Sequence, residues 1–146
     1  MNPDPAAVLS LLPQRDPQPL VDRVLSVEAG TLRAVHAISP AATYFAGHFP
    51  GDPVVPGVVQ LDALVQAAGL LALATDPTLA GGRLLMMGLD RVRFRRPVRP
   101  GEELDLCVTV VTQRGPMWKV DATASVGEEV ATSARLLLNI TLADAR

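Results

Sequence analysis

The chain has 146 residues, 49% of them hydrophobic and 19% charged, with a formal net charge of −2, and this length fits a single domain, 1–146, around one core. A mean hydropathy of +0.27 excludes a disordered chain and indicates that another subunit covers part of the apolar surface. The negative net charge does not favour binding to nucleic acid or to an anionic membrane. The one cysteine, Cys107, excludes an internal disulfide and a multi-thiolate metal site.

The first third of the chain predicts a short helix and a hairpin. Residues 6–12 form a helical segment that stops before Pro13, because proline disfavours helix at the preceding residue. Residues 20–27 and 31–38 show β-branched side chains and partial alternation around a turn at Gly30, as expected of two paired strands. The early Asp4 and the prolines do not match a signal peptide, so we expect a cytoplasmic protein.

A loop and one long helix follow. Residues 39–56 are rich in proline, glycine and small side chains and predict the loop. The helix should run from Pro56 or Gly57 to about Thr75, since a proline at a helix start loses no hydrogen bond. Its faces are apolar almost all round, so it must be wrapped by protein. It is slightly short for a bilayer span and includes polar residues, so no membrane insertion is expected.

The remainder of the chain predicts strands separated by turns. The four candidates are residues 84–94, 103–113, 117–126 and 130–142. The turn residues between them are typical of consecutive antiparallel strands. About six antiparallel strands and one buried helix imply an α+β domain in which a curved sheet wraps the helix, a hot-dog fold. Long strands with little outer cover favour pairing of two protomers.

Asp62 is an acid in an otherwise apolar helix, and burying an ionised carboxylate costs several kcal/mol unless it is paired or neutralised. Gln66 lies one turn along the same face and can hydrogen-bond it, while Gly69 leaves room beside it. Desolvation raises the pKa of such a carboxyl, which suits a general acid. The alternative is a structural Asp62 bonded to loop amides.

The segment HFPGDPVVPG, residues 48–57, surrounds His48 with prolines and glycines that hold a loop in one conformation. An imidazole suits a general base, and the free amides at the helix start, Gly57 and Val58, suit a developing oxyanion. Together with Asp62 these groups would serve β-elimination of water from a 3-hydroxyacyl thioester without a metal or cofactor. A structural role is the alternative for His48 and the one expected for His36.

Four blocks of the chain resemble the 3-hydroxyacyl-(acyl-carrier-protein) dehydratases of the FabZ/FabA type, which are hot-dog proteins. The blocks are LLPQRDPQPLVDRV, GHFPGDPVVPGV, QLDALVQAAG and GLDRVRFRRPVRPGEEL. The resemblance implies that His48 is the base and Asp62 the acid, with an oxyanion amide from Gly57. It further implies that Val54 orients His48 through its carbonyl and that Gln66 bonds Asp62. We expect the substrate to contact Phe49, Val54, Val58, Gln66 and Gly69.

In this family the histidine and the acid come from different subunits, so the resemblance implies a homodimer with shared sites, alone or as a trimer of dimers. FabZ-type enzymes usually carry Glu at the position of Asp62, whereas FabA-type enzymes carry Asp. Gln14, Asp16 and Gln18 also depart from the usual FabZ residues.

Five arginines gather within nine residues: Arg91, Arg93, Arg95, Arg96 and Arg99. They are either a solvated strand edge, with Val92 and Phe94 facing the core, or a docking surface for an acidic carrier protein and the phosphate of its pantetheine arm. The sequence thus predicts a dehydratase of 3-hydroxyacyl chains on acyl-carrier protein in fatty acid or related biosynthesis. The alternatives are a hot-dog thioesterase and a non-catalytic acyl-binding subunit.

Overall fold

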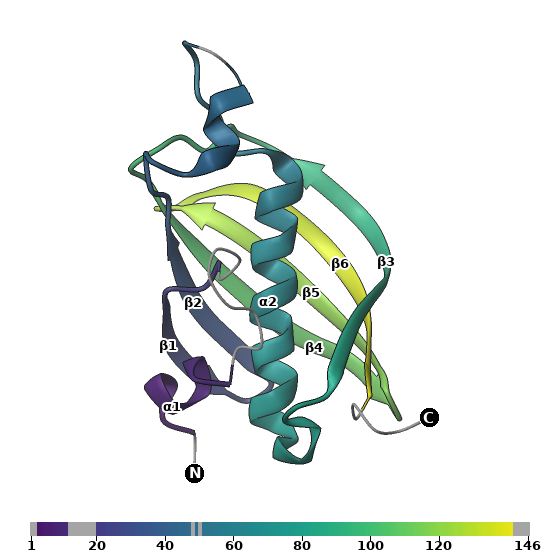
Figure 1. Ribbon diagram of the computed structural model, residues 1–146. Helices are drawn as coiled ribbons and strands as arrows, with labels where there is room; N and C mark the ends of the chain where they lie inside the picture. Colours follow the sequence, from purple (N-terminus) through teal and green to yellow (C-terminus); the bar gives the residue numbers. More distant parts are fainter. Residues whose placement is uncertain (1–2, 12–19, 48, 50, 142–146) are drawn as a thin grey trace.

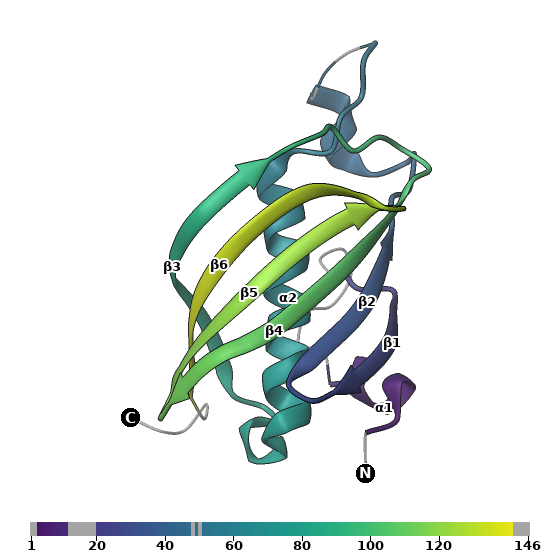
Figure 2. The ribbon, with the colours of Figure 1, turned by 180° about the vertical axis from the view of Figure 1, so that it is seen from behind.

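The structure, a computed structural model, describes residues 3–11, 20–47, 49 and 51–141. One antiparallel sheet with strand order β1-β2-β4-β5-β6-β3 curves around the long helix α2 (Figures 1 and 2). The strands are β1 (Arg23–Glu28), β2 (Thr31–Ala37), β3 (Arg83–Phe94), β4 (Glu103–Arg114), β5 (Met117–Val126) and β6 (Glu129–Thr141). The helices are α1 (Pro5–Leu9), α2 (Gly57–Thr75) and the short 3-10 turns η1 (Thr43–Gly47) and η2 (Pro77–Leu79).

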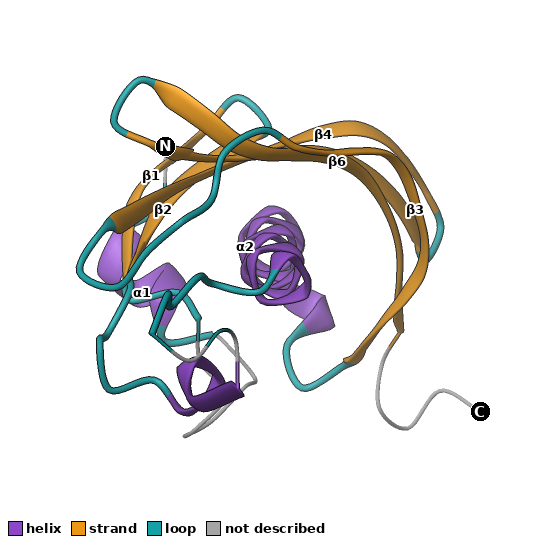
Figure 3. Cartoon of the chain, turned by 90° about the horizontal axis from the view of Figure 1, so that it is seen from above, coloured by secondary structure: helices purple, strands orange, loops and turns teal. Residues whose placement is uncertain are grey.

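The predicted hot-dog fold is confirmed. Viewed along the helix axis, α2 lies inside the concave face of the sheet (Figure 3), as the all-round apolar sequence of the helix requires. Every residue from Gln60 to Leu73 except Asp62 is buried. By length and composition α2 could cross a membrane, but 72% of the relevant window is buried within the domain, and the helix is therefore the core of this fold.

Strands β4, β5 and β6 pair in consecutive order, as their turns predict, but the expectation that β3 belongs to the same consecutive series is wrong, because β3 pairs with β6 at the edge of the sheet. Alternation along β6 sends Leu136, Leu138 and Ile140 into the core, which fixes the register because a slip of one residue would expose all three. The convex face of the sheet carries no helix among the described elements (Figure 2). The core is therefore confined to the side that holds α2.

Strand β3 lies at an edge of the sheet and exposes apolar side chains. Leu85, Met86, Met87 and Leu89 are each between 40% and 56% exposed, in a strand that has β6 as its one partner in the sheet. The pairing of β3 with β6 is interrupted between Asp90 and Arg93, where Arg91 adopts a φ of 56°. An apolar edge strand is a ready template for pairing with another chain.

The expectation that Val92 and Phe94 both face the core is half wrong. Val92 packs against the core, but the Phe94 side chain is 56% exposed. Phe94 pairs with Thr132 at the end of β3, beyond the interruption at Arg91. At that point the strand has reached the first turn of α2, so the ring lies over the helix start instead of the core.

Candidate active site

His48 lies outside the described residues, so its predicted role stays a prediction. The loop around it is closed by a turn in which the amide of Phe49 donates to the carbonyl of Asp52 at 3.2 Å and the amide of Asp52 donates to the carbonyl of Phe49 at 2.9 Å. Gly51 adopts a φ of 79°, a conformation that glycine takes without steric cost. The turn leaves the Phe49 side chain 52% exposed.

Two further contacts fix this loop to the segment that follows β3. The amide of Val55 donates to the carbonyl of Val98 at 2.8 Å, and both residues are buried. Arg99 donates through Nη1 to Asp52 Oδ1 at 2.6 Å and to the carbonyl of Pro53 at 3.4 Å. Arg99 therefore braces the loop that contains His48.

The first turn of α2 begins at Gly57. Pro56 precedes it, and the Pro56 carbonyl accepts the amides of Val59 and Gln60. The amides of Gly57 and Val58 come before the first intrahelical hydrogen bond and have no partner among the described residues. A Cβ on Gly57 would lie 2.7 Å from Phe94 Cε1, closer than atoms pack. The first-turn amides can therefore receive an incoming oxygen, and the glycine lets the Phe94 ring lie close beside them.

Asp62 is exposed on α2 in the single protomer, which corrects the expectation of a buried carboxyl. Apolar neighbours still desolvate the carboxyl group, and this raises its pKa above the ordinary value for aspartate. A hydrogen bond from Gln66 lowers the pKa by a smaller amount. The net effect favours the protonated carboxyl, the form that can donate a proton to a leaving hydroxyl.

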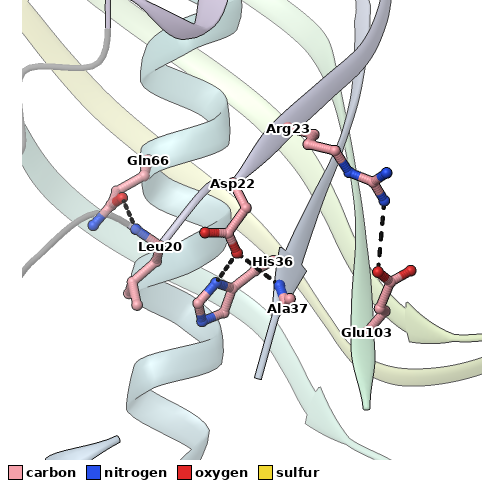
Figure 4. A network of polar contacts seen from close by, with 7 residues as sticks. All are labelled: Leu20, Asp22, Arg23, His36, Ala37, Gln66 and Glu103. Atoms are coloured by element: carbon pink, nitrogen blue, oxygen red, sulfur yellow. Dashed lines mark hydrogen bonds and ion pairs between the residues drawn. The ribbon is translucent and has the colours of Figure 1, made fainter. Parts of the chain in front are cut away.

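Gln66 connects Asp62 to the N-terminal segment. It is 1% exposed, and its Oε1 accepts the amide of Leu20 at 2.7 Å (Figure 4). An acceptor oxygen committed to Leu20 leaves the NH₂ group of the same amide to donate toward Asp62. The predicted hydrogen bond between Gln66 and Asp62 is therefore present, and the support of Gln66 by Leu20 could not be predicted from the sequence.

Polar contacts near this site have structural functions. His36 is 8% exposed, and its Nδ1 lies 2.9 Å from Asp22 Oδ2, which also accepts the amide of Ala37 (Figure 4). On the other side of α2, Thr132 donates to Gln60 at 2.5 Å, with both side chains buried. Among the described residues, no three His, Cys, Asp or Glu side chains form a group that could hold a metal ion.

The five arginines do not form one free surface. Arg96 pairs with Glu102 at 3.1 Å and approaches Glu129 at 3.9 Å, and Arg99 pairs with Asp52. Arg91 lies 3.9 Å from Asp90, while Arg93 and Arg95 are exposed and form no ion pair with any described residue. Only part of the predicted strip is thus available to a partner, because Arg96 and Arg99 hold the chain's own loops.

Gly69 continues the face of Asp62 and Gln66. A Cβ there would lie 2.7 Å from Leu84 Cδ1, so the room that the sequence predicted beside Gly69 is occupied in part by a leucine of β3. A small cavity remains next to this contact, lined by Gln66, Gly69 and Leu84 among others.

The curved sheet, the central helix and a loop that leads into a bare helix start define a protein of the hot-dog class. Among solved structures, the dehydratase heterocomplex ApeI:P from Xenorhabdus doucetiae superposes with a TM-score of 0.78 at 18% identity, covering 97% of this chain and 93% of that one. A mutant thioesterase from Pseudomonas aeruginosa superposes with a TM-score of 0.72 at 11% identity, covering 95% and 94%. These similarities establish the fold.

Sequence comparison identifies the family within that class. Residues 12–135 match the model of the FabA-like domain. A 3-hydroxyacyl-[acyl-carrier-protein] dehydratase FabZ of Syntrophobacter fumaroxidans is 39% identical over 137 residues, 94% of this chain and 93% of the relative. The FabZ of Verminephrobacter eiseniae is 45% identical over 134 residues, 90% and 89% of the two chains. The chain belongs to the FabA-like family, among the FabZ-type dehydratases.

Proposed function

We propose that this protein dehydrates 3-hydroxyacyl thioesters on acyl-carrier protein to trans-2-enoyl thioesters in cytoplasmic fatty acid biosynthesis. The observation that carries the proposal is Asp62, a carboxyl with a raised pKa held by Gln66 in a chain of the FabZ-type family. A raised pKa favours the protonated carboxyl, and a protonated acid is what departure of a hydroxyl group requires.

In the proposed reaction His48 removes a proton from C2 of the substrate. Negative charge moves to the thioester oxygen, which the amide of Gly57 receives at the positive end of α2. The C2–C3 double bond forms as the C3–O bond breaks, and Asp62 gives its proton to the leaving hydroxyl, which departs as water. After the water leaves, His48 carries the proton taken from C2 and Asp62 is ionised. Loss of that proton from His48 to solvent and uptake of one by Asp62 restore both groups.

Helix geometry supports a site made from two copies of the chain. Gly57 and Asp62 are five residues apart on α2, which puts them about 140° apart around the axis and about 7.5 Å along it. The amides at the helix start point along the axis, whereas the Asp62 side chain leaves the helix sideways, so one protomer presents the two groups in different directions. The exposed apolar edge of β3 supplies a surface for a second copy, whose Asp62 would complete the site beside His48 and Gly57.

The arginines that do not pair with the chain's own loops define a smaller docking surface for the carrier than the sequence predicted. Arg93 and Arg95 flank the half-exposed Phe94, which lies against the helix start at Gly57. Exposed arginines beside a site entrance suit an acidic carrier and the phosphate of its pantetheine arm. We propose that these two residues, with Arg91 beside them, receive the carrier.

The assay is formation of the enoyl thioester, followed by its absorbance, from 3-hydroxyacyl carrier protein. We expect turnover by the parent chain and its loss in His48→Ala and in Asp62→Asn. Release of free thiol instead of an enoyl product would establish a thioesterase, and binding of the carrier without turnover would establish an acyl-binding subunit. Either result refutes the proposal.

Mixing the two inactive variants tests the shared site. In a dimer with sites at the interface, one chain of a mixed pair supplies an intact His48 and the other an intact Asp62, so random exchange restores about a quarter of the sites. Sites contained within one chain would restore no activity. A mixture that stays inactive although subunit exchange is demonstrated would contradict the two-chain site.

A further inference from the structure

A buried hydrogen bond ties the first turn of α2 to the sheet. Gln60 is the first buried residue of the helix and is 3% exposed, whereas Val58 in the same turn is 72% exposed. The Gln60 Oε1 atom accepts the hydroxyl of Thr132 at 2.5 Å, and Thr132, in β6, is fully buried. The side chain of Gln60 therefore joins the start of the helix to β6.

The polar character of this contact is not needed for stability. An apolar pair of the same shape would stabilise the fold about as well, because burying an amide and a hydroxyl costs about what their hydrogen bond returns. A hydrogen bond is directional, however, whereas apolar burial is not. A satisfied polar pair in the core therefore fixes how the helix turns and slides against β6, more strictly than an apolar pair would.

The turn that Gln60 holds carries the amides proposed to receive the thioester oxygen. The Pro56 carbonyl accepts the amide of Gln60, and Gly57 lies three residues before Gln60, about 4.5 Å along the axis. Thr132 is also the partner of Phe94 in the pairing of β6 with β3, and a Cβ on Gly57 would lie 2.7 Å from that ring. Both contacts locate the helix start against the same point of the sheet.

Of these two contacts, the one with Thr132 is the more rigid. The Phe94 ring is 56% exposed and can turn outward, while the side chains of Gln60 and Thr132 are enclosed. We propose that their buried hydrogen bond positions the amides of Gly57 and Val58 for the developing oxyanion. Gln60 and Thr132 are positioning residues, since neither touches the reacting atoms, and their assignment rests on the proposed dehydration.

The experiment compares variants of the pair by their kcat, KM and melting temperature, with 3-hydroxyacyl carrier protein as the substrate. Thr132→Val keeps the shape of the side chain and removes the hydroxyl. It should lower both kcat and the melting temperature, because the buried oxygen of Gln60 loses its donor. Adding Gln60→Leu makes the pair apolar and should restore most of the melting temperature. The kcat of this double variant should stay about tenfold or more below that of the parent, short of the roughly 100- to 1,000-fold loss caused by removing an oxyanion donor.

The KM should change little in every variant, because the charge on the thioester oxygen develops only as the reaction proceeds. Thr132→Ser keeps the hydroxyl and should keep kcat near the parent value. Thr123→Val is the matched control. Thr123 lies on β5 between the buried Ala122 and Ala124, so its side chain is on the face of the sheet away from α2, and kcat should not change.

Three results would overturn the proposal. The first is a double variant with the kcat of the parent, which would show that turnover follows stability alone. The second is an equal loss of kcat in Thr132→Ser and Thr132→Val, and the third is a loss in Thr123→Val as large as that in Thr132→Val.

A second readout separates this inference from the proposed function. The backbone amide resonances of Gly57 and Val58, measured by NMR without substrate, report the position of the helix start. They should shift in the double variant and stay in place in Thr132→Ser and Thr123→Val. If the parent chain shows no dehydration but this pattern of shifts is found, the proposed function fails and the positioning assignment stands. If dehydration occurs and the double variant matches the parent in both resonances and kcat, only the assignment fails.

Discussion

Replacing Gln66 with leucine tests whether this buried amide controls Asp62. The change keeps the approximate volume of a side chain that is 1% exposed but removes the acceptor of the Leu20 amide, 2.7 Å away, and the donor to Asp62. A partly buried amide without an acceptor costs about 1–3 kcal/mol, and the added apolar burial offsets part of it. We therefore expect a loss of about 1–2 kcal/mol of unfolding free energy.

The second consequence of Gln66→Leu is electrostatic. The hydrogen bond from Gln66 lowers the pKa of Asp62 against the larger desolvation effect, so its removal leaves desolvation unopposed and the pKa rises. The limb of the pH profile of kcat/KM that reports Asp62 should move to higher pH. Dehydration rates across a pH series and thermal unfolding of the same preparations measure the two effects.

Gln60→Leu is the matched control for this variant. Gln60 is also a buried glutamine of α2, 3% exposed, and it also accepts one strong hydrogen bond, from Thr132. Gln60→Leu should lose a similar unfolding free energy, because the buried hydroxyl of Thr132 is left without its partner. The limb of the pH profile of kcat/KM that reports Asp62 should not move. A pH profile that is unchanged in Gln66→Leu, or shifted equally in both variants, would refute the claim that Gln66 positions the acid.

Two further predictions concern the helix start and the acid itself. Gly57→Ala introduces a methyl group 2.7 Å from Phe94 Cε1. Because the ring is 56% exposed and can turn outward, the loss of unfolding free energy should lie near the lower end of about 1–3 kcal/mol. Turnover should fall by more than this loss of stability explains. Adding Phe94→Ala should restore stability but not turnover, because the methyl group at position 57 still obstructs the approach of the thioester oxygen to the amide. Recovery of both would show that this approach does not require glycine. The melting temperature of Asp62→Asn should rise relative to that of the parent as pH increases from about 4 toward neutrality. The reason is that a carboxyl with a raised pKa in the folded chain stabilises the fold only while it is protonated. A difference in melting temperature that does not change with pH would contradict the raised pKa.

The fold followed from patterns that are local in sequence. An apolar helix with no polar face can only be a core helix, and α2 is one. Residues 130–142 were predicted as a strand bounded by turns, and β6 runs from Glu129 to Thr141. Such periodicities are set within a few residues and need no knowledge of distant partners.

The partners of polar side chains could not be predicted in this way. Arg99 was expected on a docking surface, but it pairs with Asp52, which lies 47 residues earlier in the chain. Gln66 hydrogen-bonds the amide of Leu20, and Gln60 hydrogen-bonds Thr132, and in both cases the partners are 46 or more residues apart in the chain. The exposure of Phe94 has a local origin. Asp90 and Arg91 are consecutive polar residues that break the alternation of β3, and the interruption at Arg91, where φ is 56°, changes the course of the strand.

The partial exposure of Asp62 is informative about assembly. A carboxyl that faces open water keeps its ordinary pKa, and one that is sealed in a core needs several hydrogen bonds. Asp62 satisfies neither condition in one protomer, since its pKa is raised while its side chain remains exposed on the surface of α2. In the proposed dimer, a second copy paired along the apolar edge of β3 would cover Asp62 and bring its own helix start to it. The proposed interface therefore accounts together for the exposed acid, the amides of Gly57 and Val58 and the edge strand.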